Sequence, residues 1–197
     1  MPDSICNLTI SDFLDALAYK SATPGGGSAS ALIAAQGAAL FSMVCEFTQP
    51  SDESLLNIHQ ICLVTQTKLL GLVQEDIDAF NIVMECYADK GSYQYEKAIE
   101  TAVTVSLNIM REASALADAS EYLSKQGNKN LISDVAIGAN LLSAGIESAY
   151  INVLVNLKTI SNDLISRETK EQSRNYLQSS DRLTKIYRFI RDGLWEP

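Results

Sequence analysis

The sequence has little of several residue types on which enzymes and binding proteins commonly rely. It contains a single histidine, His59, which lies among leucines with no cysteine or histidine at ligand spacing. We therefore expect no Ser-His-Asp triad and no metal site, and interpret His59 as a structural residue. The glycines lack the Gly-Lys-Ser that a phosphate-binding loop needs. The four cysteines occur singly, without a C-x-x-C pair, and are interpreted as mostly buried free thiols.

Long hydrophobic runs and positive charge are also scarce. No N-terminal signal and no apolar stretch of about 18 residues is recognised, so we expect a cytoplasmic protein that does not enter a membrane. The chain has 15 Lys and Arg residues against 24 Asp and Glu, which gives a formal net charge of −9. This balance argues against nucleic acid as a partner. An anionic ligand would need a local positive feature.

The sequence is rich in apolar residues at helical spacing, and 47% of its 197 residues are hydrophobic. Strand-like alternation is absent, and the stripes repeat about every 3.6 residues. They predict helices over residues 9–19, 28–47, 51–90, 95–125, 130–160 and 163–194. Long helices with short connections predict a single all-α domain over residues 1–197. Its architecture would be an antiparallel up-and-down bundle of about six helices, several of them about 30 residues long.

A glycine-rich stretch, Thr23-Pro24-Gly25-Gly26-Gly27-Ser28, precedes a helix of very small residues. Three glycines leave the backbone free to adopt positive φ or to approach another group closely. The amides of Gly25, Gly26, Gly27 and Ser28 could hold an anionic or polar ligand group at the positive end of the helix. A flexible loop followed by an N-capped helix explains the same residues, and both interpretations stay open here.

Asp76 interrupts the apolar stripe of the third predicted helix. Counting in steps of four and three gives Leu69, Val73, Asp76, Phe80, Val83 and Tyr87, which predicts a buried carboxylate. Such a group needs a partner, a raised pKa or a ligand. Pairing with a lysine or capping of a neighbouring helix would satisfy it without any catalytic role. Catalysis is the alternative that the position equally permits.

The fifth predicted helix carries a stripe of small or polar residues. Its members are Asp134, Gly138, Leu141, Gly145, Ser148, Asn152 and Asn156. Glycines inside a helix are costly, so the stripe predicts either close helix packing or a groove for a long ligand. Asp134 and Asn152 are 18 residues apart in the sequence, or about 27 Å along the axis. They cannot both touch one reacting atom.

Four segments together resemble a known family, the cyclodeaminase domain of formiminotransferase-cyclodeaminase, whose stand-alone bacterial members include methenyltetrahydrofolate cyclohydrolases. The segments are Ser21–Ala31, Leu72–Phe80, Gly127-Asn128 with Ser133-Asp134, and Ala149–Leu157. The resemblance covers essentially the whole chain and implies an all-helical homodimer. It places the catalytic acid at Asp76. The family often has Asp at the position of Gln74, so a second carboxylate is missing here.

The chemistry that this resemblance implies takes place on a tetrahydrofolate derivative, with or without a polyglutamate tail. A formiminotetrahydrofolate cyclodeaminase closes the N5,N10-methenyl bridge and releases ammonia, and a methenyltetrahydrofolate cyclohydrolase opens that bridge with water. We expect the first, with the second as the alternative and a non-catalytic helical binding or assembly module as a third reading. The expected substrate-binding residues are Gly25, Gly26, Gly27, Ser28, Asp134, Asn152 and Asn156, with Lys20, Lys129 and Lys158 as candidates for the tail. The implied reactions need no metal and no cofactor beyond the folate.

Overall fold

The computed structural model describes residues 5–160 and 162–195, apart from the side chain of Cys6. The elements are η1 (Ile5–Asn7), α1 (Ile10–Ala18), α2 (Gly26–Glu46), α3 (Glu53–Glu85), η2 (Tyr87–Asp89), α4 (Tyr93–Ser114), α5 (Ala117–Gln126), η3 (Lys129–Leu131), α6 (Ile132–Leu157) and α7 (Asp163–Trp195). No strand occurs in this part of the chain, so the predicted all-α class is confirmed.

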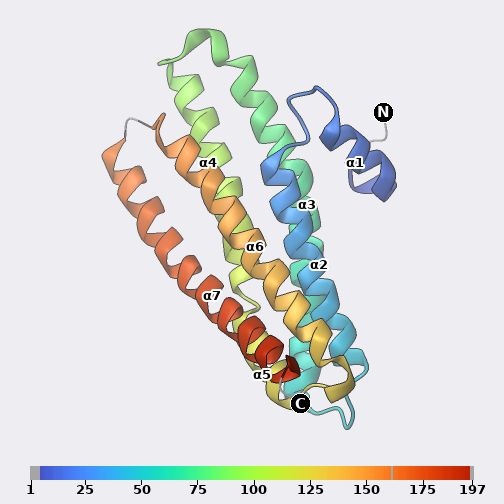
Figure 1. Cartoon of the computed structure of the whole chain (residues 1–197). Coiled ribbons are helices and arrows are strands. Elements are labelled where there is room, and N and C mark those ends of the chain that lie inside the picture. The colour runs from blue at the N-terminus through green and yellow to red at the C-terminus, as the bar shows by residue number, and fades with distance from the viewer. Residues whose placement is uncertain (1–4, 161, 196–197) are drawn as a thin grey trace.

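The long helices run alternately up and down and form an elongated bundle (Figure 1). α2 packs against both α3 and α6, whereas α4 and α7 complete the bundle around α6. The short helix α1 lies outside this bundle, beside α2 and α3 (Figure 1). The predicted antiparallel arrangement is thus confirmed, and α2 holds the position that its small side chains indicated.

Contact between α2 and α6 is backbone to backbone. A Cβ at Gly37 would lie 2.8 Å from the Gly138 carbonyl oxygen, and one at Gly145 would lie 2.7 Å from the Ala34 Cβ. A side chain at any of these glycines would push the two helices apart, since packed Cβ atoms do not approach so closely. Close packing therefore explains Gly138 and Gly145, and the groove interpretation does not apply to them.

α2 is longer and more apolar than the sequence analysis allowed. It is 21 residues long, Gly26–Glu46, and an 18-residue window within it has a mean hydropathy of 1.6. The helix thus has the length and composition of a membrane span, so the expectation that no segment does so is wrong. However, 61% of that window is buried inside the bundle. Core helices pass the same test, so this observation alone is weak support for a membrane span.

Some predicted helix boundaries need correction. The predicted helix over 95–125 is two helices, because the chain breaks at Ala115-Leu116 between α4 and α5. No glycine or proline marks this break. It turns α5 toward α7, where Arg182 pairs with Asp118 and Glu121.

The predicted helices over 28–47 and 51–90 also shift at their ends. α2 begins at Gly26, two residues earlier than expected. Asp52 caps α3 through its bond from the Leu55 amide, in place of Ser51. α3 ends at Glu85, and a 3₁₀ turn follows in place of the last predicted helical residues.

The cysteines and the single histidine, both scarce in the sequence, are buried or half-buried where the structure describes their side chains. Cys45 and Cys62 are buried and free, Cys86 is free and half-buried, and the side chain of Cys6 lies outside the described part. His59 is half-buried with its Nε2 3.2 Å from Glu46 Oε1, which agrees with a structural role. Among the described residues, no three His, Cys, Asp or Glu side chains lie together in a group that could hold a metal ion.

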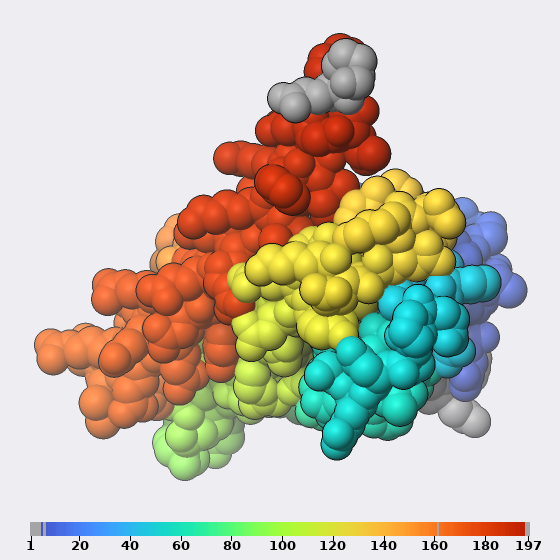
Figure 2. Space-filling model, turned by 90° about the horizontal axis from the view of Figure 1, so that it is seen from below, coloured from blue at the N-terminus to red at the C-terminus, as the bar shows by residue number. Residues whose placement is uncertain are grey.

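The C-terminal turns of α7 project beyond the rest of the protein when the bundle is viewed from below (Figure 2). Phe189 and Trp195 are strongly exposed on this projection. The projection lies at the opposite end of the bundle from the N-terminus of α2 (Figure 1).

Candidate active site at the start of the second helix

Asp76 of α3 caps the N-terminus of α2. Its Oδ2 accepts a hydrogen bond of 2.8 Å from the Ser28 amide and one of 2.9 Å from the Ser28 hydroxyl. The N-cap residue of α2 is Gly25, which has no side chain to bond its own helix end. A carboxylate from the neighbouring helix therefore does what an N-cap side chain normally does. One of the non-catalytic interpretations, capping of a neighbouring helix, thus holds for Oδ2.

The second carboxylate oxygen has no such partner. Among the described residues no donor is bonded to Asp76 Oδ1, and the side chain is half-buried. Burial raises the pKa of Asp76 above its ordinary value, although the hydrogen bonds from the Ser28 hydroxyl and amide act in the opposite direction. A carboxyl group with a raised pKa and one uncommitted oxygen is suited to accept and return a proton.

Gly27 lies against the same carboxylate. A Cβ at this position would be 1.9 Å from Asp76 Oδ1 and 2.4 Å from its Cγ. Positive φ is not the reason for the glycine, because Gly91 alone among the described glycines has one. Of the two uses of glycine that the sequence allowed, positive φ does not occur in this stretch, and close approach of α3 is what Gly27 permits.

The expected anion site at this helix end is altered by Asp76. The Ser28 amide, one of the free donors of the first turn, is already bonded to the protein's own carboxylate. Negative charge at a helix N-terminus is favourable, but a second anion would meet the first at short range. The end of α2 is therefore better suited to a cationic group than to the anionic group that the glycines suggested.

Asn152 reaches the same place from α6. A Cβ at Gly26 would lie 3.8 Å from its Oδ1 and 3.9 Å from its Nδ2, so the amide faces the start of α2. Asn156 is half-buried one helical turn further along α6, on the same face. The structure thus brings together Gly26, Gly27, Ser28, Asp76 and Asn152, with Gly25 and Asn156 beside them.

Asp134 is not part of this group. It lies in the first turn of α6, whereas Asn152 lies near the end of that helix. Since the two are about 27 Å apart along the axis, Asp134 is at the far end of the bundle from Asp76. As the sequence spacing indicated, Asp134 does not reach the reacting atoms at Asp76 of the same chain, and this placement does not support its expected place among the substrate-binding residues of that site.

The three candidate lysines also lie at different ends of the bundle. Lys20 precedes the glycine-rich stretch and Lys158 follows α6, so both lie at the end of the bundle that holds Asp76. Lys129 lies beside the start of α6, where its Nζ donates to the carbonyl oxygens of Ser124 and Lys125. Within one chain, Lys129 therefore lies at the opposite end of the bundle from Asp76.

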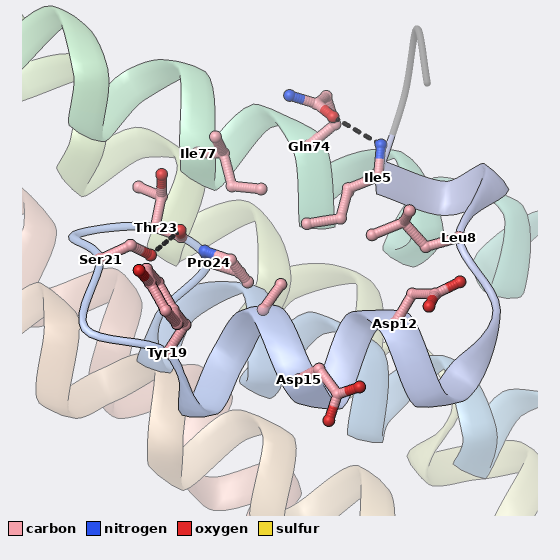
Figure 3. Close-up of a pocket in the computed structure, with 11 residues that line it drawn as sticks. Ile5, Leu8, Asp12, Asp15, Tyr19, Ser21, Thr23, Pro24, Gln74 and Ile77 are labelled. Carbon is pink, nitrogen blue, oxygen red and sulfur yellow. Dashed lines mark hydrogen bonds between the residues drawn. The ribbon is translucent and has the colours of Figure 1, made fainter. Parts of the chain in front are cut away.

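Gln74 lies on another face of α3. Its amide donates to Asp78 and its carbonyl accepts the Ile5 amide, and it lines a cavity of about 720 Å³ between α1 and α3 (Figure 3). Asp76 is not among the residues lining this cavity. The missing second carboxylate at position 74 therefore does not concern the group around Asp76. Because Asp76 does not line it, this cavity is a weaker candidate for the catalytic centre.

Phe80 is more exposed than its sequence pattern predicts. The stripe of α3 predicts a buried side chain one turn beyond Asp76, yet 37% of Phe80 is exposed. Nothing in the local pattern could have shown this, because the exposure depends on where α2 begins.

Over nearly its whole length, the chain is similar to proteins named as cyclodeaminases or as a cyclohydrolase. The family profile described as Formiminotransferase-cyclodeaminase matches residues 9–175. A methenyltetrahydrofolate cyclohydrolase of Methylorubrum extorquens is 32% identical over 94% of this chain and 97% of its own length. A formimidoyltransferase-cyclodeaminase of Mus musculus is 29% identical over 90% of this chain, which spans about a third, 36%, of that protein. The crystal structure of a formiminotetrahydrofolate cyclodeaminase from Thermotoga maritima superposes with a TM-score of 0.89 at 29% identity, covering 95% of this chain and 98% of the other.

Proposed function

Since the chain belongs to the formiminotransferase-cyclodeaminase family, we propose that it is an enzyme acting on the one-carbon bridge between N5 and N10 of tetrahydrofolate. The observation that carries this proposal is Asp76, a half-buried carboxylate at the start of α2 whose Oδ1 accepts no hydrogen bond from the residues that the structure describes. The reaction centre passes through a cationic amidinium, and an anionic group of this kind stabilises such a cation.

One carboxyl group is sufficient for the proton transfers of ring closure. N10 attacks the carbon of the protonated formimino group on N5, a carbon–nitrogen bond forms while the C=N double bond gives its electron pair to the outer nitrogen, and N10 loses its proton. The amine on that carbon must gain a proton before the bond to it breaks and ammonia leaves. Asp76 Oδ1 can accept the first proton and return it to the departing amine, because its raised pKa suits both steps.

The polar groups around Asp76 are proposed to orient the folate. The Asn152 amide, close to Gly26, offers both a donor and an acceptor to the ring edge. Asn156 offers the same groups one turn further along. Lys20 and Lys158 are the proposed contacts of the carboxylate tail. An anionic tail needs positive charge nearby in a chain whose net charge is −9, and these two lysines lie at the end of the bundle that holds Asp76.

Of the two reactions, we propose formiminotetrahydrofolate cyclodeaminase as the activity, in line with the Thermotoga maritima neighbour. Methenyltetrahydrofolate cyclohydrolase is the second candidate. The Methylorubrum extorquens relative, which matches this chain over 97% of its own length, favours it. In that reaction the same carboxylate would remove a proton from water as the water adds to the methenyl carbon.

Turnover of the two folates separates these candidates. The purified chain is expected to convert 5-formiminotetrahydrofolate to the 5,10-methenyl form with release of ammonia, followed by methenyl absorbance. A cyclohydrolase would instead consume added 5,10-methenyltetrahydrofolate faster than buffer does, and would release no ammonia from the formimino compound. If neither compound is converted above the buffer rate, the proposed function is wrong.

We also propose that two copies of the chain associate through the outer faces of α2 and α6. Ile137, Ile151 and Val155 are exposed along one face of α6, and Phe47 is exposed at the end of α2. Between Gly26 and Cys45 α2 has no charged side chain. Two chains with a net charge of −9 repel each other least through an uncharged surface, and an apolar face of this kind can meet its own copy about a twofold axis.

Light scattering in solution tests this association. The wild-type chain is expected to have twice the mass of one chain, and Ile151→Glu is expected to shift it to a single chain, because a charge would be buried in the contact. Leu164→Glu, at an exposed apolar position on α7, is the matched control and is expected to leave the mass unchanged. A wild-type protein that stays monomeric at micromolar concentration would rule the proposal out.

A further inference from the structure

Phe80, the member of the α3 stripe that follows Asp76, reaches the surface, although Val83 after it is buried again against α4. Leu69 and Val73 are essentially inaccessible, whereas Phe80 is 37% exposed on the same stripe. Isolated exposed aromatic residues are common on proteins. This one is notable because it continues a core stripe and lies one helical turn from the uncommitted carboxylate oxygen.

The start of α2 explains this exposure. α2 covers α3 as far as Ser28, which bonds Asp76, and the helix begins only two residues before that, at Gly26. The α3–α4 hairpin extends beyond this point, above the first turn of α2 (Figure 1). No residue of α2 is therefore available to cover Phe80.

The hairpin that carries Phe80 is held in place without burying it. Val83 of α3 packs with Tyr95, Ala98 and Ile99 of α4 in a small core separate from the main one. This second core fixes the end of α3 relative to α4. Phe80 is thus an exposed ring on a supported helix, and a flat ligand would not need to order a loop in order to bind it.

Helix geometry directs the ring toward Asp76. Side chains three or four residues apart on a helix are neighbours, with Cβ atoms about 5–6 Å apart. An aromatic side chain on a helix also leans toward the N-terminus and covers the turn before its own Cα. By this geometry Phe80, four residues after Asp76, is directed toward the turn that presents Asp76.

We propose that Phe80 is a positioning residue on which a ring of the folate stacks while Asp76 Oδ1 faces the one-carbon bridge. This inference rests on the proposed function. N5 belongs to the reduced pterin and N10 to the p-aminobenzoyl group, so both rings adjoin the reacting carbon. A carboxylate at the bridge must therefore have one of the rings within a few ångströms, and Phe80 supplies an apolar aromatic surface there.

Phe80→Leu removes the aromatic face and keeps an apolar side chain of similar size. It is expected to weaken binding of 5-formyltetrahydrofolate, measured by calorimetry, by roughly tenfold, since aromatic pairs are favourable beyond the area they bury. KM for the turned-over folate is expected to rise by a similar factor with a smaller change in kcat. Phe80→Tyr, which keeps the ring, is expected to bind like the wild type.

Phe189→Leu is the matched control, because Phe189 is an exposed phenylalanine on α7 at the other end of the bundle. It is expected to bind and turn over folate like the wild type. Folate binding by Phe80→Leu that equals the wild type would overturn this inference alone. Loss in both Phe80→Leu and Phe80→Tyr would also overturn it, because the ring would then not be what matters. A wild-type chain that neither binds nor converts folate would overturn the proposed function, and this inference with it.

Discussion

Replacing Asp76 with asparagine is expected to lower kcat by about 10²–10⁴-fold, the range for loss of a general acid–base group. The asparagine side chain has the size of the aspartate side chain. Its oxygen can still accept hydrogen bonds from the Ser28 backbone amide and hydroxyl, which donate to Oδ2 in the wild type. It cannot carry a proton between N10 and the departing amine, and it places no negative charge beside the amidinium. Steady-state rates with both folates measure the effect, and circular dichroism verifies that the helices are retained.

The same variant is expected to be at least as stable as the wild type. Because burial raises the pKa of Asp76, folding favours the protonated carboxyl group. The stability that this group contributes is fully present below its unfolded pKa and is lost as pH rises through the raised folded value. An asparagine does not ionise, so above that pH it avoids the cost of keeping a charge half-buried.

Asp78→Asn is the matched control for Asp76→Asn. Asp78 is an exposed aspartate on the same helix, and its carboxylate accepts from the Gln74 amide away from the start of α2. Its replacement is expected to leave the rates nearly unchanged. An Asp76→Asn protein that kept more than about a tenth of wild-type kcat would remove Asp76 from the chemistry. Loss of activity together with a large loss of stability would assign Asp76 to capping of α2 alone.

Gly27→Ala is expected to have the second large effect, on activity and stability together. The new methyl group would lie 1.9 Å from Asp76 Oδ1, so the carboxyl group must rotate or α3 must move away. Either change breaks the bonds to Ser28 and leaves the end of α2 without its cap, which costs about 1–2 kcal/mol of unfolding free energy. Displacement of the carboxylate by an ångström or more is expected to lower kcat on the order of 10²-fold.

Urea denaturation and steady-state kinetics of the purified variant measure both parts of this prediction. Gly71→Ala is the control, because it is the same substitution within α3 and its Cβ would meet only Glu75 Oε1 at 3.9 Å. That variant is expected to be stabilised by up to about 1 kcal/mol, since alanine is the better helix former. A Gly27→Ala enzyme with wild-type kcat would show that the carboxylate need not stay where the structure places it.

The sequence predicts the local helical structure and also identifies Asp76, the residue that departs from the apolar pattern of its helix. Stripes at helical spacing located the long helices, and the small side chains of α2 indicated its central place, because both signals depend on near neighbours in the chain. Asp76 was found as a charge at an apolar position. The break at Ala115-Leu116 was not found, since no glycine or proline marks it and contact of α5 with α7 stabilises it.

Residues with several possible roles could be sorted only by their contacts. Gly138 and Gly145 share a stripe with Asn152, yet the glycines pack closely against the middle of α2, whereas the asparagine amide faces Gly26 at its first turn. Gln74 lies two residues from Asp76 and contacts a different set of groups. Periodicity assigns a residue to a face, but it does not say which partner covers that face or where the cover ends.

The glycine-rich stretch shows the difference between what the sequence determines and what only the tertiary structure decides. By itself, the sequence determined that a helix of small residues begins there, and it left open whether the glycines form a ligand site or a flexible loop before the helix. Only the tertiary structure decided that Gly27 is needed because Asp76 lies against it, that Ser28 bonds this carboxylate, and that Phe80 is left uncovered. These are contacts between segments distant in the chain, fixed by where one helix ends against another, and a pattern of near neighbours carries no record of them.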